Sequence, residues 1–262
     1  MSTLATVRQS WMLTLRDLKH WQREPWAPAF TIAFTIMLLV MFGYLFGGAI
    51  ELPGGGDYRT YLLPGIFALS MMFGIDATMA TVTQDTRRGV TDRFRSLPMN
   101  AVSVPIGRAV ADLIQSAAQL LVLTIGGLLL GWRVHGSPTA AIAGIALLLW
   151  LRFAMLWIGI FLGLTFRATG ALTAVQVLVW PLGFLSNLFV APSTMPDWLG
   201  FLAEWNPVSA TATACRQLFG NPTGSTGSVL ADHAILLATL WPLLLVALFA
   251  PLSARAYRRL SS

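Results

Sequence analysis

Residues 84–99 read QDTRRGVTDRFRSLPM, and this charged stretch lies between two segments that are too apolar to sit in water. Its charged side chains are Asp85, Arg87, Arg88, Asp92, Arg93 and Arg95. Val90, Phe94 and Leu97 recur at helical spacing, which predicts an amphipathic helix that ends at Pro98. Such a helix is about 20 Å long at about 1.5 Å per residue. The stretch is either a solvated loop on the positively charged side of a membrane or a docking helix for a cytoplasmic partner.

The composition around this stretch is that of an integral membrane protein. The chain has 262 residues, of which 56% are hydrophobic and only 11% charged, and its mean hydropathy is +0.69. A soluble domain carries about a quarter charged residues. We therefore attribute the formal net charge of +6 to arginines arranged about a membrane, and not to nucleic-acid binding. The single cysteine, Cys215, excludes an internal disulfide, and three histidines far apart in sequence predict no metal site.

Six segments have the length and apolar character of membrane spans, which need about 20 apolar residues. We expect the spans at residues 28–48, 60–83, 106–131, 139–164, 171–190 and 231–253. The cations on one side of them are Arg8, Arg16, Lys19, Arg23, Arg87, Arg88, Arg93, Arg95, Arg108, Arg167, Arg255, Arg258 and Arg259. The cations on the other side are only Arg59, Arg133 and Arg216. By the positive-inside rule, both termini and residues 84–99 are cytoplasmic, in a single all-helical transmembrane domain over residues 1–262.

Two amphipathic segments accompany the spans. Residues 1–26 carry one apolar helical face with the cations off it, which predicts a helix lying in the lipid headgroup layer. That face consists of Leu4, Val7, Trp11, Leu15 and Leu18. Residues 191–230, on the outer side, are too long for a structureless loop and predict two short helices joined at Asn206-Pro207. The faces of these helices are Trp198, Phe201 or Leu202, and Trp205 in the first, and Val208, Ala212, Cys215 and Phe219 in the second.

Three charged residues fall within the expected spans: Asp76 in the second, Asp112 in the third and Arg152 in the fourth. A charge inside the membrane costs about 2.5 to 3.5 kcal/mol on insertion scales, so each needs a partner or a function. We predict that Arg152 pairs with Asp76 or Asp112. Such a pair either holds three helices in register or forms a polar feature of a translocation route.

Three G-x-x-x-G steps allow close approach of helices, either within one subunit or across a dimer. They are formed by Gly43 and Gly47, by Gly127 and Gly131, and by Gly159 and Gly163.

The residues of this chain do not predict catalysis. Ser186 lacks the flanking glycine of a serine nucleophile, and Asp76 and Asp112 lack the G-x-G-D context of an intramembrane aspartyl protease. A Walker A loop needs Gly-Lys, whereas the only lysine is Lys19 in Leu-Lys-His. We therefore expect no catalytic residue and no cofactor in this chain, so that any ATP is handled by another polypeptide.

The order and spacing of several short motifs carry a resemblance to a known family. Those near the charged stretch are Asp85, Arg88-Gly89, Arg93-Phe94, Leu97-Pro98, and Gly107-Arg108 with Asp112 beyond. Those of the outer segment are Pro192, Met195-Pro196, Trp198-Leu199, Asn206-Pro207 and Arg216. Over essentially its whole length the chain resembles the membrane subunit of an ABC-2 type transporter, of the daunorubicin-resistance-like subfamily of drug exporters. It departs from many relatives at residues 90–92, Val-Thr-Asp, where they have Gly-Thr-Leu-Glu-like residues.

The resemblance implies a working unit of two membrane subunits, identical or homologous, and two ATPase subunits that bind ATP and Mg. It also implies that residues 84–99 form a coupling helix, with Val90, Phe94 and Leu97 in an apolar cleft of the ATPase and charged side chains around its rim. The expected coupling residues are Asp85, Arg87, Arg88, Gly89, Val90, Arg93, Phe94, Leu97 and Pro98. The N-terminal helix would brace the first span at the membrane interface.

The same resemblance implies export of a drug or lipid-like amphiphile across the inner membrane of a bacterial cell. Within the same class, a polysaccharide or lipid-linked glycan is the alternative cargo, because related permeases carry these through aromatic-lined channels and this chain has ten tryptophans. From a different class, an ATP-independent secondary transporter or membrane enzyme is the alternative. Secondary transporters often show inverted repeats and midplane carboxylates, whereas here only Asp76 and Asp112 are available, both near the inner side.

Overall fold

The computed structural model describes residues 3–23, 26–47, 50, 52–53, 55–87, 103–166, 169–224 and 228–259. Within these ranges every regular element is a helix, which confirms the predicted all-helical fold. The elements are α1 (Thr3–Arg23), α2 (Trp26–Leu45), α3 (Tyr58–Met72), α4 (Gly74–Arg87), α6 (Ser103–Leu129), α7 (Pro138–Thr165), α8 (Thr169–Phe184), the 3₁₀ helix η1 (Pro192–Thr194), α9 (Asp197–Trp205), α10 (Pro207–Phe219), α11 (Val229–Asp232) and α12 (Ala234–Arg259).

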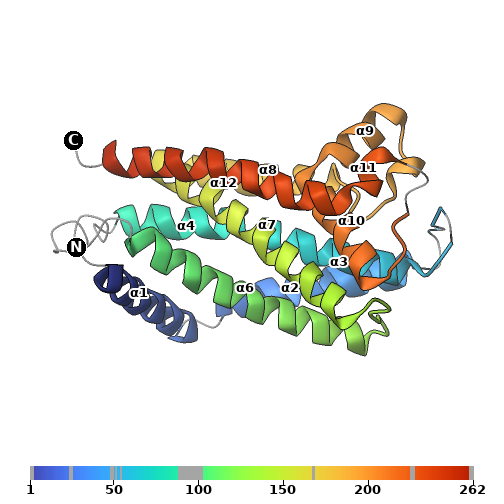
Figure 1. Cartoon of the computed structure of the whole chain (residues 1–262), viewed down its shortest axis with the longest axis horizontal. Coiled ribbons are helices and arrows are strands. Elements are labelled where there is room, and N and C mark those ends of the chain that lie inside the picture. The colour runs from blue at the N-terminus through green and yellow to red at the C-terminus, as the bar shows by residue number, and fades with distance from the viewer. Residues whose placement is uncertain are drawn as a thin grey trace.

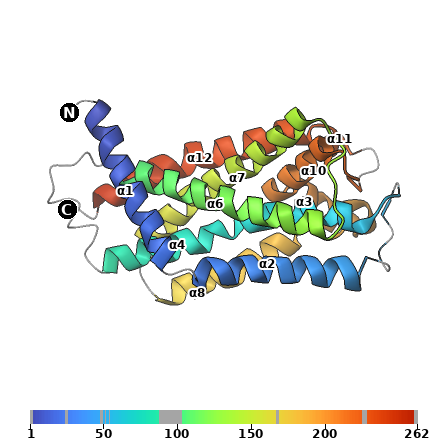
Figure 2. The same cartoon turned by 90° about the horizontal axis from the view of Figure 1, so that it is seen from below.

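The long helices run side by side along one axis of the molecule (Figures 1 and 2). Both termini lie at one end of the bundle, where α4 ends and α6 begins (Figure 1). The short helices α9, α10 and α11 lie together at the opposite end (Figure 1). We call the first the terminal end and the second the capped end. The two termini thus share one end with the base of the 84–99 stretch, which is the arrangement that the distribution of arginines predicts.

Four helical segments among the described residues are long and apolar enough to cross a membrane. They are Tyr58–Arg87, Pro105–Leu129, Pro138–Thr165 and Ala234–Arg258. Two further apolar segments, Ala29–Leu45 and Gly170–Phe184, are shorter. The expected fifth span, residues 171–190, corresponds to α8, which stops at Phe184. Beyond that point the Asn206 side chain donates hydrogen bonds to the carbonyl oxygens of Leu182 and Leu185, at 3.0 and 3.1 Å, and so satisfies acceptors that a longer helix would have used.

The core of the bundle forms around α3, in which thirteen of fifteen residues are buried. The Phe67 ring meets Trp132 edge-on with centroids 5.6 Å apart, and Trp132 meets Phe219 in the same way at 5.5 Å. These rings bring α3, the end of α6 and α10 together at the capped end. Because lipid tails are as apolar as leucine, close packing, rather than removal of apolar surface from water, holds such a core within a membrane.

One of the three G-x-x-x-G steps packs two helices within the subunit. A Cβ atom added to Gly159 would lie 2.7 Å from the carbonyl oxygen of Ile75, and one added to Gly163 would lie 2.9 Å from that of Met79. The α7 backbone therefore touches α4 directly. Gly127 likewise admits the side chain of Leu63 on α3.

The amphipathic helix α1 crosses α6 near the terminal end (Figure 2). The Thr14 hydroxyl donates a 3.0 Å hydrogen bond to the Gly107 carbonyl oxygen, and a Cβ atom at Gly107 would lie 2.7 Å from the Ser10 carbonyl oxygen. Trp11 and Leu15, on the predicted apolar face, are exposed. Among the described residues the helix therefore braces α6, and its exposed Trp11 and Leu15 face outward, as in a helix at a lipid interface. The expected brace on the first span stays a prediction.

The predicted pair of short helices is confirmed as α9 and α10. Asn206 separates them, and its side-chain oxygen accepts a 2.9 Å hydrogen bond from the Val208 N–H at the start of α10. The predicted faces differ in surroundings: the aromatic face of α9 is exposed, whereas the face of α10 from Val208 to Phe219 is buried in the core.

Candidate functional site: charged residues within the helical bundle

Arg152 of α7 pairs with Asp112 of α6. Its Nε donates a 2.7 Å hydrogen bond to Asp112 Oδ2, and Nη2 donates a second bond to Oδ1. This two-point geometry is the strongest that a guanidinium and a carboxylate form. Of the two partners that the sequence offered, the structure therefore selects Asp112, and the pair joins α6 to α7.

The guanidinium of Arg152 rests on the backbone of Gly74, the first residue of α4. A Cβ atom at this position would lie 1.1 Å from Arg152 Nη1, so any side chain here would displace the arginine. Helices α3 and α4 meet at Phe73, which keeps a helical backbone and donates its N–H to the Leu69 carbonyl oxygen at 3.1 Å, so that Tyr58–Arg87 forms one helical span. The need for glycine at position 74 coincides with the position of the buried cation.

Asp76 makes no ion pair with Arg152 in the structure. It lies in the first turn of α4, and its Oδ1 is buried without a hydrogen-bond partner among the described residues. Thr83, two turns along the same face of α4, carries a second buried oxygen with no partner in that set. Buried polar atoms are nearly always hydrogen-bonded, so two unpartnered buried oxygens on one face of α4 are unusual.

The terminal end carries a second ion pair between two helices. Arg108 of α6 pairs through Nη2 with Asp85 Oδ2 near the end of α4. Arg87 is exposed in the last turn of α4. The other expected coupling residues, Arg88, Gly89, Val90, Arg93, Phe94, Leu97 and Pro98, lie outside the described residues. Asp85 thus has a partner within this chain, at the base of the stretch assigned to coupling.

Arg216 of α10 is the fully buried cation at the capped end. Its Nε donates a 2.9 Å hydrogen bond to the Tyr61 carbonyl oxygen, and Nη2 donates to the carbonyl oxygens of Asn187 and Leu188 at 3.0 and 3.2 Å. The guanidinium also lies 3.6 Å from the centroid of the Tyr61 ring. Carbonyl dipoles and a ring face therefore stabilise the charge, and they tie α10 to α3 and to the segment after α8.

From the sequence alone, Arg216 falls in an outer connection, and its burial is not predicted. A usable signal was present, because Arg216 follows Ala212 by one helical turn and so belongs to the apolar face that begins at Val208. Cys215, its neighbour on that face, is also buried, and burial raises the pKa of its thiol to about 12.

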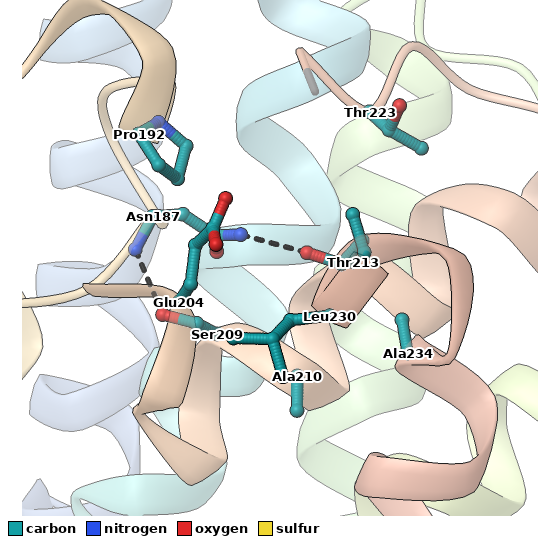
Figure 3. A pocket seen from close by; sticks show the side chains of 10 residues that line it. Asn187, Pro192, Glu204, Ser209, Ala210, Thr213, Thr223, Leu230 and Ala234 are labelled. Carbon is teal, nitrogen blue, oxygen red and sulfur yellow. Dashed lines mark hydrogen bonds between the residues drawn. The ribbon is translucent and has the colours of Figure 1, made fainter. Parts of the chain in front are cut away.

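A small polar pocket lies beside this cluster, between the end of α8 and the short helices (Figure 3). Figure 3 shows Asn187 reaching two residues of α10: its N–H donates to the Ser209 hydroxyl at 2.9 Å, and its side-chain amide donates to Thr213 Oγ1 at 2.7 Å. Glu204 faces the same space and accepts a 2.7 Å hydrogen bond from Ser228. The hydrogen bonds that border the pocket thus join the segment after α8 to α10, and α9 to the residue that precedes α11.

The comparison with known proteins defines the class. The profile of the family described as "ABC-2 type transporter" matches residues 8–219, and the chain belongs to that family. It is 33% identical over 230 residues to the "Daunorubicin resistance ABC transporter permease protein DrrB1" of Streptomyces coeruleorubidus, which covers 87% of this chain and 78% of the relative. It is 23% identical over 193 residues to the "Probable multidrug ABC transporter permease YbhR" of Escherichia coli strain K12, which covers 72% of this chain and 50% of that protein. The chain is therefore an ABC-2 permease of the drug-resistance transporter family and a multi-pass membrane protein.

Proposed function

We propose that this chain is the membrane-spanning subunit of an ATP-driven exporter that moves a drug or lipid-like amphiphile out of the cytoplasm. Two such subunits work with two separate ATPase subunits in the inner membrane of a bacterial cell. The names of the relatives, which refer to daunorubicin resistance and probable multidrug transport, support this choice of cargo.

The chain crosses the membrane six times in this proposal, with both termini cytoplasmic and residues 191–230 outside. The common position of the two termini, and the excess of arginine at that end, support the orientation. The two shorter helices, α2 and α8, complete the count. At 20 and 16 residues they are about 30 and 24 Å long, which fits a hydrocarbon layer about 30 Å thick with slight local thinning at α8.

The observation that carries the proposal is the exposed face of α4. The side chains that α4 turns away from the bundle are Ala77, Thr81 and Gln84, which are all exposed. By contrast, α12 exposes Leu236, Leu240, Leu244 and Leu248. The Thr81 hydroxyl donates a 2.9 Å hydrogen bond to the Ala77 carbonyl oxygen, and Gln84 lies just beyond the expected end of the span. The described outward residues of α4 thus include no large apolar side chain among Ala77, Thr81 and Gln84, which supports a passage beside α4 better than a lipid-facing wall like that of α12.

Co-purification tests the proposal directly. The wild-type chain, extracted from its native host in mild detergent, should bring down a stoichiometric ATPase. The double variant Phe94→Ala, Arg88→Glu in the coupling stretch should lose it, whereas Arg255→Glu, an exposed charge reversal near the end of α12, should retain it. A folded wild-type chain that recovers no ATPase would contradict the proposal.

A further inference from the structure

We propose that Asp76 is a binding residue for the cargo, and that it selects amphiphiles bearing a positive charge. This inference rests on the proposed export function and adds the charge of the substrate. It follows from the charges within the bundle, the access to Asp76 and the side chains near it.

The first step is the balance of charge. Asp112 engages Arg152 through both carboxylate oxygens, so that these two charges neutralise each other. Asp76 forms no ion pair with any described residue, and its Oδ1 is buried and lacks a hydrogen-bond partner in that part of the chain. An ionised group within a membrane protein is costly unless something pairs with it. In this proposal the transported molecule supplies the missing partner.

The second step is access from the terminal end. Asp76, Ala80 and Gln84 are spaced by one helical turn each and so form one row on α4. Ala80 is small and half-buried, and Gln84 is exposed. Asp76 thus lies about 12 Å from Gln84 along a row without bulky side chains, at about 1.5 Å per residue. The row borders the exposed face of α4, and in this proposal the ligand approaches the carboxylate along it.

The third step is the apolar wall one turn from Asp76. Phe73 packs against Trp180 of α8 with ring centroids 4.9 Å apart, and Trp180 also meets Phe34 of α2 at 5.6 Å. All three rings are only partly buried. Gln176 lies one turn from Trp180 toward the terminal end and is exposed, which places its amide near the depth of Asp76.

Together these features define the ligand class. A carboxylate binds a cationic nitrogen, an amide oxygen accepts its N–H bonds, and aromatic rings accommodate an apolar body and attract the charge. An anionic amphiphile would be repelled by the carboxylate. The site therefore suits a protonated amine or another organic cation attached to an apolar ring system.

The test uses two probes of similar shape that differ in charge: radiolabelled tetraphenylphosphonium, a lipophilic cation, and triphenylphosphine oxide, which is neutral. Binding is measured on the full-length permease in nanodiscs of uncharged lipid. The wild type should bind the cation more tightly than the neutral probe. Asp76→Asn, which keeps the size of the side chain, should raise the Kd of the cation about tenfold or more and change that of the neutral probe less than about twofold.

Two further variants separate charge from general damage. Asp76→Glu should keep the Kd of the cation within about threefold of wild type, because it retains the carboxylate. Asp197→Asn, which removes an exposed carboxylate at the capped end, should change neither Kd. Equal binding of the two probes by the wild type would overturn the inference, whatever the variants do. So would an equal loss of both probes in Asp76→Asn, or dissociation of a permease dimer by that variant, since the carboxylate would then belong to the subunit interface.

Recovery of the ATPase, measured on the same preparations, distinguishes this inference from the proposed function. Selective binding of the cation without any ATPase would leave Asp76 as a cation site and reject ATP-driven export. Recovery of the ATPase with no preference for the cation would support ATP-driven export and reject Asp76 as a cation site.

Discussion

The two halves of the second span, α3 and α4, differ in what surrounds them. Thirteen of the fifteen residues of α3 are buried, whereas only six of the fourteen residues of α4 are. Close packing and the Arg216 cluster fix α3. Close packing against Gly159 and Gly163 of α7 holds one side of α4, and charged contacts hold it near its two ends, where Arg152 rests on Gly74 and Arg108 pairs with Asp85. One continuous helical stretch can therefore be buried in the core at one end and leave a face with polar side chains exposed at the other.

The largest effect on stability is expected from a substitution in the Arg216 cluster, which fixes α3. Arg216→Gln should lower the free energy of unfolding by about 3–5 kcal/mol, because it leaves the carbonyl groups of Tyr61, Asn187 and Leu188 without their donors. Thermal unfolding in detergent, followed by tryptophan fluorescence, measures the change. Arg216→Lys should recover only part of it, because an ammonium group cannot reproduce the planar set of donors.

Arg133→Gln is the matched control for this variant, since Arg133 is an exposed cation at the same end of the bundle. It should cost less than about 1 kcal/mol. Equal melting temperatures for the Arg216 and Arg133 variants would show that the buried cluster does not fix α3.

A smaller loss of stability is expected from a substitution at Gly74, where α3 and α4 meet. Gly74→Ala should cost about 2–3 kcal/mol, because the new Cβ atom would occupy the position of the Arg152 guanidinium. Adding Asp112→Asn should cost less than the sum of the two single changes, since both disturb one ion pair. Gly126→Ala on α6, where a Cβ atom has open space, should be neutral or stabilise the protein by up to about 1 kcal/mol. Strict additivity in the double variant would argue against the link between Gly74 and the pair.

Substitutions on the outward faces of α4 and α12 are expected to have the smallest effect on stability. These two faces are also expected to differ most in their exposure to water. Thr81→Cys on α4 should react with a membrane-impermeant maleimide in inside-out vesicles, whereas Leu248→Cys on the leucine-lined face of α12 should not. The native Cys215 should stay silent in both, because at pH 8 a thiol with a pKa of about 12 is ionised in only about one molecule in 10,000. Comparable labelling at the two positions would remove the evidence that α4 borders an aqueous passage.

Local patterns in the sequence predicted much of the fold. The helical faces of residues 191–230 predicted α9 and α10 and their joint at Asn206, and the cost of charge in a membrane predicted a partner for Arg152. Contacts between distant residues decided what the sequence could not show. The end of α8 is accompanied by hydrogen bonds from Asn206, Gly74 lies against a cation from α7, and Arg216 is stabilised by carbonyl groups that no side-chain pattern reveals.

The step from Gly107 to Arg108 joins three helices at the terminal end. The backbone of Gly107 receives α1 through Thr14, and the side chain of Arg108 holds α4 through Asp85. Two adjacent residues of α6 thus connect this helix to both α1 and α4. We expect a displacement of any one of these three helices to be transmitted to the other two through these contacts.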